Sequence, residues 1–154
     1  MSKAFTSEET PETGPVVRGP PRLAPGEIRY ITPEGRAALE AERQRLRAAA
    51  TPDAEARVAV LDAILRGVTV ASADAAPAGI AAFATWVTVE EEDGSRRTWR
   101  LVGPDEADAR RGLVSVRSPV GRALLGRRAG DVVEVERPGG ASELTIVSIS
   151  RTAP

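Results

Sequence analysis

The side chains that could carry chemistry in this 154-residue sequence are carboxylates and basic groups, because the sequence contains no His and no Cys. His is the commonest catalytic base and metal ligand, and Cys is needed for disulfides and thiolate metal sites. Ser-His-Asp catalysis, Cys-His catalysis and zinc chemistry are therefore excluded. Any catalysis would have to use carboxylates, lysine, arginine or a borrowed metal ion.

Asp53 and Glu55 are acidic residues that follow Thr51-Pro52, between two segments of helical composition. One interpretation is an acidic pair near the tip of a helical hairpin. The favoured interpretation is structural, because negative side chains in the first turn of a helix complement its dipole. We therefore predict no catalytic residue here.

Arginines occur in small clusters, and one of these clusters, Arg43, Arg45 and Arg47, lies in the first helical segment. Most such clusters form solvated surface. The nearly balanced net charge of −1 argues against a protein that binds duplex DNA mainly through its phosphates.

Arg117-Ser118-Pro119 marks the start of a short helix that also contains Arg122 and closes at Gly126. Ser is a favoured N-cap, and Pro suits the first helical position because its missing N–H has no partner there. An exposed helix start is also a suitable docking surface. The capping and docking interpretations are compatible.

Two helical segments must position the acidic pair, Asp53 and Glu55, and the arginine cluster of the first segment. A helix start at Thr32-Pro33-Glu34 leads to Ala50, and Thr51-Pro52-Asp53 repeats the signal. Two antiparallel helices joined by a tight turn are predicted. A single helix kinked at Pro52 is the alternative, because the connection contains no glycine. The apolar seam of the two segments comprises Leu39, Leu46, Ala54, Val58, Leu61, Leu65 and Val68.

Residues 1–29 are predicted to be a disordered tail, because they are rich in proline and carry few large apolar side chains. No apolar run is long enough to span a bilayer, and residues 1–5 lead into polar sequence instead of a signal peptide. We therefore expect a cytoplasmic protein without a membrane segment.

Alternating strands dominate the rest of the chain. A hairpin is predicted from strands 85–90 and 98–102 around Asp93-Gly94, and further strands are predicted at 113–116, 131–135 and 143–149. Trp86 and Trp99 are expected to form a cross-strand pair or to cap the core. The predicted fold class is α+β, with a short antiparallel helical hairpin followed by an antiparallel β domain with short helices.

Residues 101–140, LVGPDEADARRGLVSVRSPVGRALLGRRAGDVVEVERPGG, resemble the C-terminal domain of the bacterial GreA/GreB transcript cleavage factors. The resemblance covers almost everything after Phe83. Residues 31–35, ITPEG, resemble the start of the family's coiled coil, and residues 1–6 are similar to the start of some GreB proteins. The resemblance implies a hairpin at 30–70, a linker at 71–82 and an FKBP-like, polymerase-binding domain at 83–154.

The resemblance also implies a partner, because family members dock on the rim of the RNA polymerase secondary channel. Arg117, Ser118, Pro119 and Arg122 are the expected partner-binding residues. The family usually has Asp or Asn where this chain has Arg117, so a partner with an acidic rim would fit better. The protein is expected to be a monomer that meets nucleic acid only within the polymerase complex.

Basic residues of the family's coiled coil help to hold the RNA 3′ end. By resemblance, Arg43, Arg45 and Arg47 are candidates for contact with RNA or with the channel wall.

The helical hairpin departs from the family pattern because its distal half is missing. Each helix here has about 16 to 18 residues, or about 25 Å at 1.5 Å per residue, against a usual arm that is roughly two dozen residues longer in total. The missing part includes the acidic tip that holds a catalytic magnesium in the polymerase, and carboxylates bind magnesium only at about 2.1 Å. The resemblance therefore predicts a short-armed regulator, similar to Rnk, with no cofactor and no catalysis of its own.

Two alternatives stay open, and a third activity is disfavoured. The chain could still stimulate transcript cleavage, with Asp53 and Glu55 reaching a magnesium ion shared with the polymerase. It could be a generic protein-interaction module. The FKBP-like fold that the resemblance implies also raises prolyl isomerase activity, which is disfavoured because it needs a pocket walled with aromatic rings and this domain offers only Phe83, Trp86 and Trp99.

Overall fold

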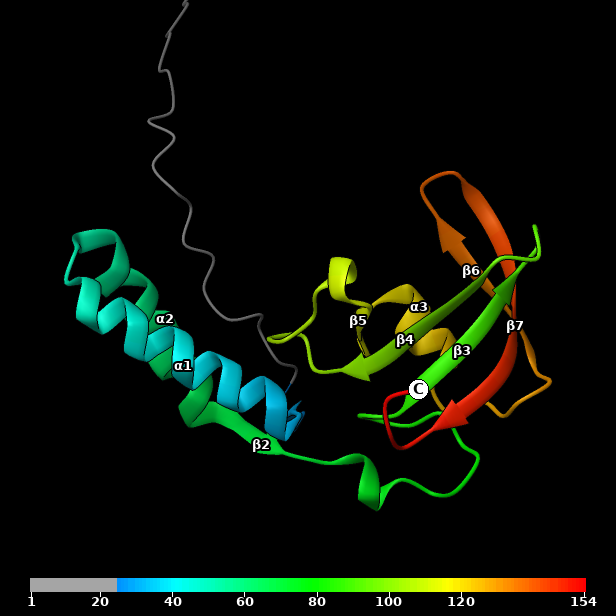
Figure 1. Ribbon diagram of the computed structural model, residues 1–154, viewed down its shortest axis with the longest axis horizontal. Helices are drawn as coiled ribbons and strands as arrows, with labels where there is room; N and C mark the ends of the chain where they lie inside the picture. Colours follow the sequence, from blue (N-terminus) through cyan, green and yellow to red (C-terminus); the bar gives the residue numbers. More distant parts are fainter. Residues whose placement is uncertain (1–24) are drawn as a thin grey trace, which may run out of the picture.

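The computed structural model describes residues 25–154 and has the α+β architecture that the sequence predicts. A helical hairpin lies beside a curled five-stranded sheet (Figure 1). None of the helices in this part of the chain combines the length and apolar character needed to cross a membrane. Residues 1–24, which hold most of the predicted tail, lie outside the described residues.

The hairpin consists of helices α1, Pro33–Ala49, and α2, Pro52–Gly67. Each helix begins with Thr-Pro, as predicted, and the Thr side chain caps it. Thr32 Oγ1 accepts a hydrogen bond from the Gly35 N–H at 3.0 Å, and Thr51 Oγ1 accepts one from the Ala54 N–H at 3.2 Å. Ala50 adopts a left-handed conformation between the helices, with φ of 49°. Two helices therefore form, and the alternative of one kinked helix is wrong.

Apolar side chains hold the two helices together over most of their length. The buried cluster comprises Ile31, Leu39, Leu61, Ile64 and Leu65, with Leu46, Val60 and Val68 packed against it. The predicted seam contained Leu39, Leu61 and Leu65 but omitted Ile64. Ile64 is buried because the apolar face of α2 is wider than a strict stripe of spacing three and four.

A two-stranded parallel sheet closes the open end of the hairpin. Strand β1, Arg29–Ile31, pairs with β2, Val68–Val70, so that the entry to α1 and the exit from α2 lie side by side. These strands were not predicted, since three residues give too little alternation to detect. Arg29 was assigned to the tail, yet it belongs to β1 and is buried.

The C-terminal sheet has the strand order β5-β4-β3-β7-β6. It is mixed, since β5 pairs with β4 in parallel, whereas a wholly antiparallel sheet was expected. The parallel pair arises because the chain crosses a short 3-10 helix, η2, Ala109–Arg111, before it returns as β5. The strands are β3, Trp86–Glu91; β4, Arg96–Val102; β5, Leu113–Ser115; β6, Val132–Arg137; and β7, Gly140–Ser150.

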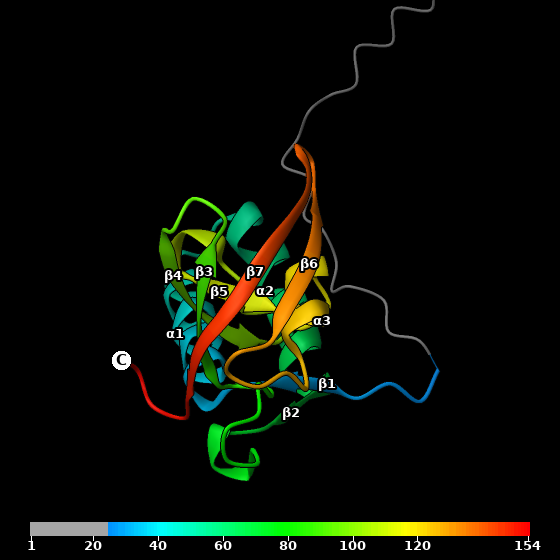
Figure 2. The ribbon, with the colours of Figure 1, turned by 90° about the vertical axis from the view of Figure 1, so that its right-hand side faces the viewer.

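One face of this sheet packs against the short helix α3, Pro119–Leu124, as the two views in Figures 1 and 2 show. The register places Trp86 opposite Arg100 and Trp99 opposite Val87, so the two tryptophans are not directly paired. Trp99 packs against the core, which agrees with the second of the two expectations for the tryptophans. The core residues are Ala81, Val87, Val89, Leu101, Leu124, Val133, Val135, Leu144 and Ile146.

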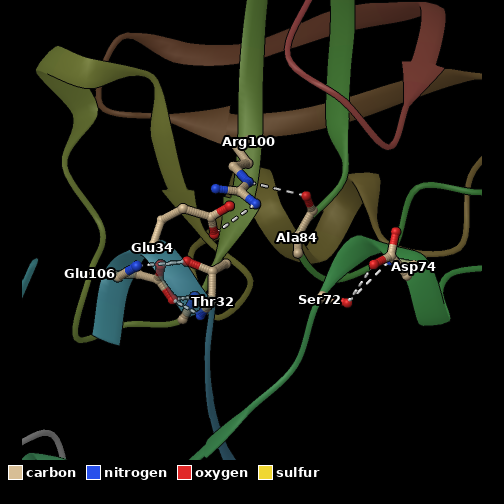
Figure 3. Close-up of polar contacts among 9 residues, drawn as sticks. Thr32, Glu34, Ser72, Asp74, Ala84, Arg100 and Glu106 are labelled. Atoms are coloured by element: carbon tan, nitrogen blue, oxygen red, sulfur yellow. Dashed lines mark hydrogen bonds and ion pairs between the residues drawn. The ribbon is translucent and has the colours of Figure 1, made fainter. Parts of the chain in front are cut away.

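The junction between hairpin and sheet is polar and tightly packed. Glu106, in the turn after β4, accepts hydrogen bonds from the Thr32 N–H at 2.7 Å, from Thr32 Oγ1 and from the Gly103 N–H at 3.3 Å (Figure 3). Its neighbour Asp105 accepts from Arg29 Nη2 at 3.0 Å, and both side chains of this ion pair are buried. The base of the hairpin is therefore fixed to the sheet domain through specific side chains.

Candidate docking surface and hairpin tip

The start of α3 is held rigidly against β5. Ser118 Oγ accepts from the Gly121 N–H at 3.1 Å and donates to the Ser115 carbonyl at 2.6 Å, while Pro119 takes the first helical position. A Cβ at Gly121 would collide with the Ser115 carbonyl, so the close approach requires glycine. The predicted capping role of Ser118 and Pro119 is confirmed, and Pro119 is exposed.

Arg117 and Arg122, the two basic residues of the predicted docking set, line one groove of about 370 Å³. Arg117 Nε donates to Glu27 at 2.9 Å, which ties the segment before β1 to the start of α3. Arg122 is exposed and forms no ion pair with another residue in the range 25–154. The groove is therefore basic at one wall. Its other lining residues are Glu27, Ile28, Arg29, Tyr30, Gly103, Pro104 and Val116.

Asp53 and Glu55 are exposed in the first turn of α2, at the distal end of the hairpin. This position agrees with the structural interpretation, in which they complement the helix dipole. Neither carboxylate forms an ion pair within the described part of the chain. Among residues 25–154 there is also no group of three or more acidic side chains placed to share a metal ion.

The three hairpin arginines do not share one face. Arg43 and Arg47 both contact Asp62 of α2, at 3.0 Å and 3.3 Å. The hydrogen bond from Arg43, with the charges of Arg47 and Arg43, lowers the pKa of Asp62. Arg45 lies on the other side of α1, in the groove between hairpin and sheet. Because successive residues are 100° apart, residues two positions apart cannot contact the same surface. Contact of these arginines with RNA stays a prediction.

The groove between hairpin and sheet, about 610 Å³, is lined by charged residues of both parts. Arg100 crosses it: Nη2 donates to Glu34 at 3.2 Å and Nε to the Ala84 carbonyl at 3.1 Å (Figure 3). The guanidinium also lies 5.5 Å from the centre of the Trp86 ring. A backbone hydrogen bond at the helix start, aided by Arg100, lowers the pKa of Glu34.

The aromatic side chains that a prolyl isomerase pocket would need lie apart in the structure. Phe83 packs against Tyr30 with ring centres 5.7 Å apart, Trp86 stacks with Arg100, and Trp99 packs against the core. The three rings do not wall a common pocket, which is the feature that this activity would need.

Sequence reasoning missed the role of Asp105 and Glu106, to which the sequence analysis assigned no contact. They are the residues that fix the hairpin to the sheet. One signal could have found them: Gly35 and Gly103 are glycines at places where a Cβ would collide with Glu106 and with the Tyr30 carbonyl. Glycine at such positions indicates close approach between segments, although it does not identify the partner.

Comparison with known proteins agrees with this arrangement. Residues 76–151 match the family model for the transcription elongation factor GreA/GreB C-terminal domain. Transcription elongation factor GreA of Chloroflexus aggregans is 35% identical over 150 aligned positions, which cover 78% of this chain and 96% of that protein. GreA of Alkalilimnicola ehrlichii is 50% identical over 66 residues, which cover 43% of this chain and only 42% of that protein.

A solved structure, GreA factor homolog 1 (Gfh1) of Thermus thermophilus, aligns with 80% of this chain and 99% of its own, at 26% identity and a TM-score of 0.43. The class that fold and sequence define is a helical hairpin carried by a C-terminal sheet domain of the elongation-factor type. The chain belongs to the GreA/GreB family of transcription elongation factors.

Proposed function

We propose that this chain binds RNA polymerase at its secondary channel through the C-terminal domain, residues 83–154, and regulates elongation without stimulating transcript cleavage. Family membership supports the partner, since the matched relatives carry the name transcription elongation factor. The exposed start of α3, with Pro119 and Arg122, supplies the docking surface. The observation that carries the proposal is the short hairpin.

The reach of the hairpin follows from its helix lengths. Helices of 17 and 16 residues extend about 25 Å at 1.5 Å per residue. A carboxylate acts on a magnesium ion only within about 2.1 Å, so side-chain flexibility cannot offset a deficit of about 18 Å, the rise of the dozen or so residues by which each helix is shorter than in the full-length arm. Asp53 and Glu55 at this tip would therefore stop short of the polymerase metal ions.

The alignment to the Chloroflexus protein supports the same conclusion. Its 150 positions cover 78% of the 154 residues here, which is about 120 residues, so about 30 positions of the relative have no counterpart in this chain. A deficit of this size agrees with a hairpin that lacks its distal half. Occupancy of the channel by such a short arm would obstruct it or compete with full-length cleavage factors.

The test combines binding and cleavage on the same polymerase. The full chain should bind core RNA polymerase, a full-length GreA should displace it, and backtracked elongation complexes should show no faster cleavage in its presence. Displacement by GreA separates the proposal from a generic interaction module, which would bind elsewhere or not at all. Binding that GreA does not compete would contradict the proposed site.

A transcript cleavage factor is the second candidate, because Asp53 and Glu55 are exposed at the end of the hairpin. Under this alternative, cleavage is stimulated and is lost in the double variant D53N/E55Q. A matched control is Glu134→Gln, which removes an exposed carboxylate on β6, far from the hairpin in sequence and structure. Cleavage that depends on the tip carboxylates, but not on Glu134, would overturn the preferred function.

A further inference from the structure

We propose that residues Glu27, Ile28 and Arg29, which lead into the hairpin, form a second wall of the polymerase-docking groove and take an apolar side chain of the partner. This inference rests on the proposed function and names a surface that lies outside the C-terminal domain. The partner surface that fits combines an apolar side chain with a neighbouring carboxylate. The first wall is the start of α3, with Arg117 and Arg122.

The two walls are joined within the protein itself. Glu27 accepts from Arg117 Nε at 2.9 Å, and two residues further on Arg29 donates to Asp105 at 3.0 Å. The Arg29 and Asp105 side chains are 8% and 1% exposed, so the segment is fixed on both sides of Ile28. A surface held in place before binding loses less conformational entropy when the partner arrives.

Ile28 is the apolar element of this second wall. It is 56% exposed and lines the same groove as Val116 and Pro104 of the sheet domain. Five large apolar side chains in the range 25–154 are between 37% and 56% exposed, and two of them, Ile28 and Tyr30, line this one groove. An exposed apolar group in a groove, with charged side chains around it, matches the apolar centre and polar rim of protein interfaces.

The charges of the groove define the rest of the partner. Glu27 already neutralises Arg117, and Asp105 neutralises Arg29. Arg122 forms no ion pair with any described residue, so it is the cation available to a partner carboxylate. Because Ile31 and Thr32 continue directly into α1, a partner bound here also holds the base of the hairpin.

The test measures binding of the full chain to core RNA polymerase for Ile28→Ser and Val132→Ser. Val132 is the matched control, since it is also 56% exposed at the start of a strand but does not line the groove. Ile28→Ser should weaken binding about five- to tenfold, whereas Val132→Ser should change it less than about twofold. Ile28→Leu should retain binding, and Arg122→Glu should weaken it about tenfold or more.

The outcomes separate the two proposals. If Arg122→Glu weakens binding while Ile28→Ser and Val132→Ser behave alike, the second wall is wrong and the proposed function stands. If the wild-type chain does not bind polymerase at all, both are wrong. Unchanged thermal midpoints for Ile28→Ser and Ile28→Leu exclude misfolding. If Ile28→Ser unfolds the chain, Ile28→Leu and Ile28→Gln provide the comparison, and equal binding by these two would overturn the second wall.

Discussion

Asp105 and Glu106 are adjacent carboxylates with different surroundings at the hairpin junction. Asp105 forms a buried ion pair with Arg29, whereas Glu106 faces three hydrogen-bond donors and no cation. Two of these donors belong to Thr32, which also caps α1. Thr32 therefore links helix capping to domain attachment, and its pairing with Glu106 is one of the contacts that set the direction of the hairpin.

Replacing Glu106 by Ala should weaken the attachment of the hairpin to the sheet and lower the stability of the hairpin. The change leaves the Thr32 N–H, the Thr32 hydroxyl and the Gly103 N–H without their acceptor, and an unsatisfied buried group costs about 1–3 kcal/mol. We expect a loss of about 2–3 kcal/mol in helix stability, measured by urea unfolding with far-UV circular dichroism. Trp86 and Trp99, both in the sheet, should report a smaller loss by fluorescence.

Glu134→Ala is the control for that experiment, because Glu134 is exposed on the edge strand β6 and its substitution should change stability by less than about 0.5 kcal/mol. Equal losses for Glu106→Ala and Glu134→Ala would show that the junction contributes nothing specific.

The functional side chains could be located from the sequence only where local rules apply. Ser118, Pro119, Thr32 and Thr51 were correctly placed, because capping depends on neighbours within three residues. The contacts of Asp105 and Glu106 join residues more than 70 positions apart, and no local rule specifies such pairs. Helical periodicity does show that Arg45 faces away from Arg43 and Arg47, although the cluster alone suggests one basic surface.

The same distinction between local and long-range determinants applies to the helices and strands. Both helices of the hairpin were predicted because each carries its own start signal and apolar face. Strands β1 and β2 were missed because a parallel pair of three residues each is defined only by its partner. The parallel pairing of β5 was missed for the same reason, since it depends on the path of the chain through η2.

The turn between the helices offers a prediction of its own. Ala50 has φ of 49° and is exposed, and a left-handed conformation strains any residue with a Cβ. Ala50→Gly should therefore stabilise the hairpin by about 0.5–1 kcal/mol, whereas Ala41→Gly, at an exposed position inside α1, should destabilise it by about 1 kcal/mol. Thermal unfolding followed by circular dichroism at 222 nm measures whether each substitution raises or lowers the stability of the hairpin. A loss of stability for Ala50→Gly would contradict the left-handed turn.

The molecule as a whole combines a C-terminal domain typical of its family with a short helical hairpin, which the proposed function interprets as a docking domain with an arm of reduced length. The groove between β1 and α3 and the junction at Glu106 both lie at the base of the arm, so they set its direction. Its length is set independently, by the turn at Ala50. Docking and reach are therefore separable properties, and a change in one should leave the other intact.

Lengthening the arm should convert the proposed regulator into a cleavage factor. Replacing Ala49–Thr51 by the distal hairpin of a full-length GreA, about 12 residues for each helix, adds about 18 Å of reach. If reach alone limits the wild-type chain, the extended chain should stimulate cleavage in backtracked complexes while its affinity for polymerase stays within about threefold. The same graft with its tip carboxylates replaced by amides should bind equally and not stimulate cleavage. An extended chain that binds normally but remains inactive would show that features of the sheet domain or junction, and not the length of the arm, prevent cleavage.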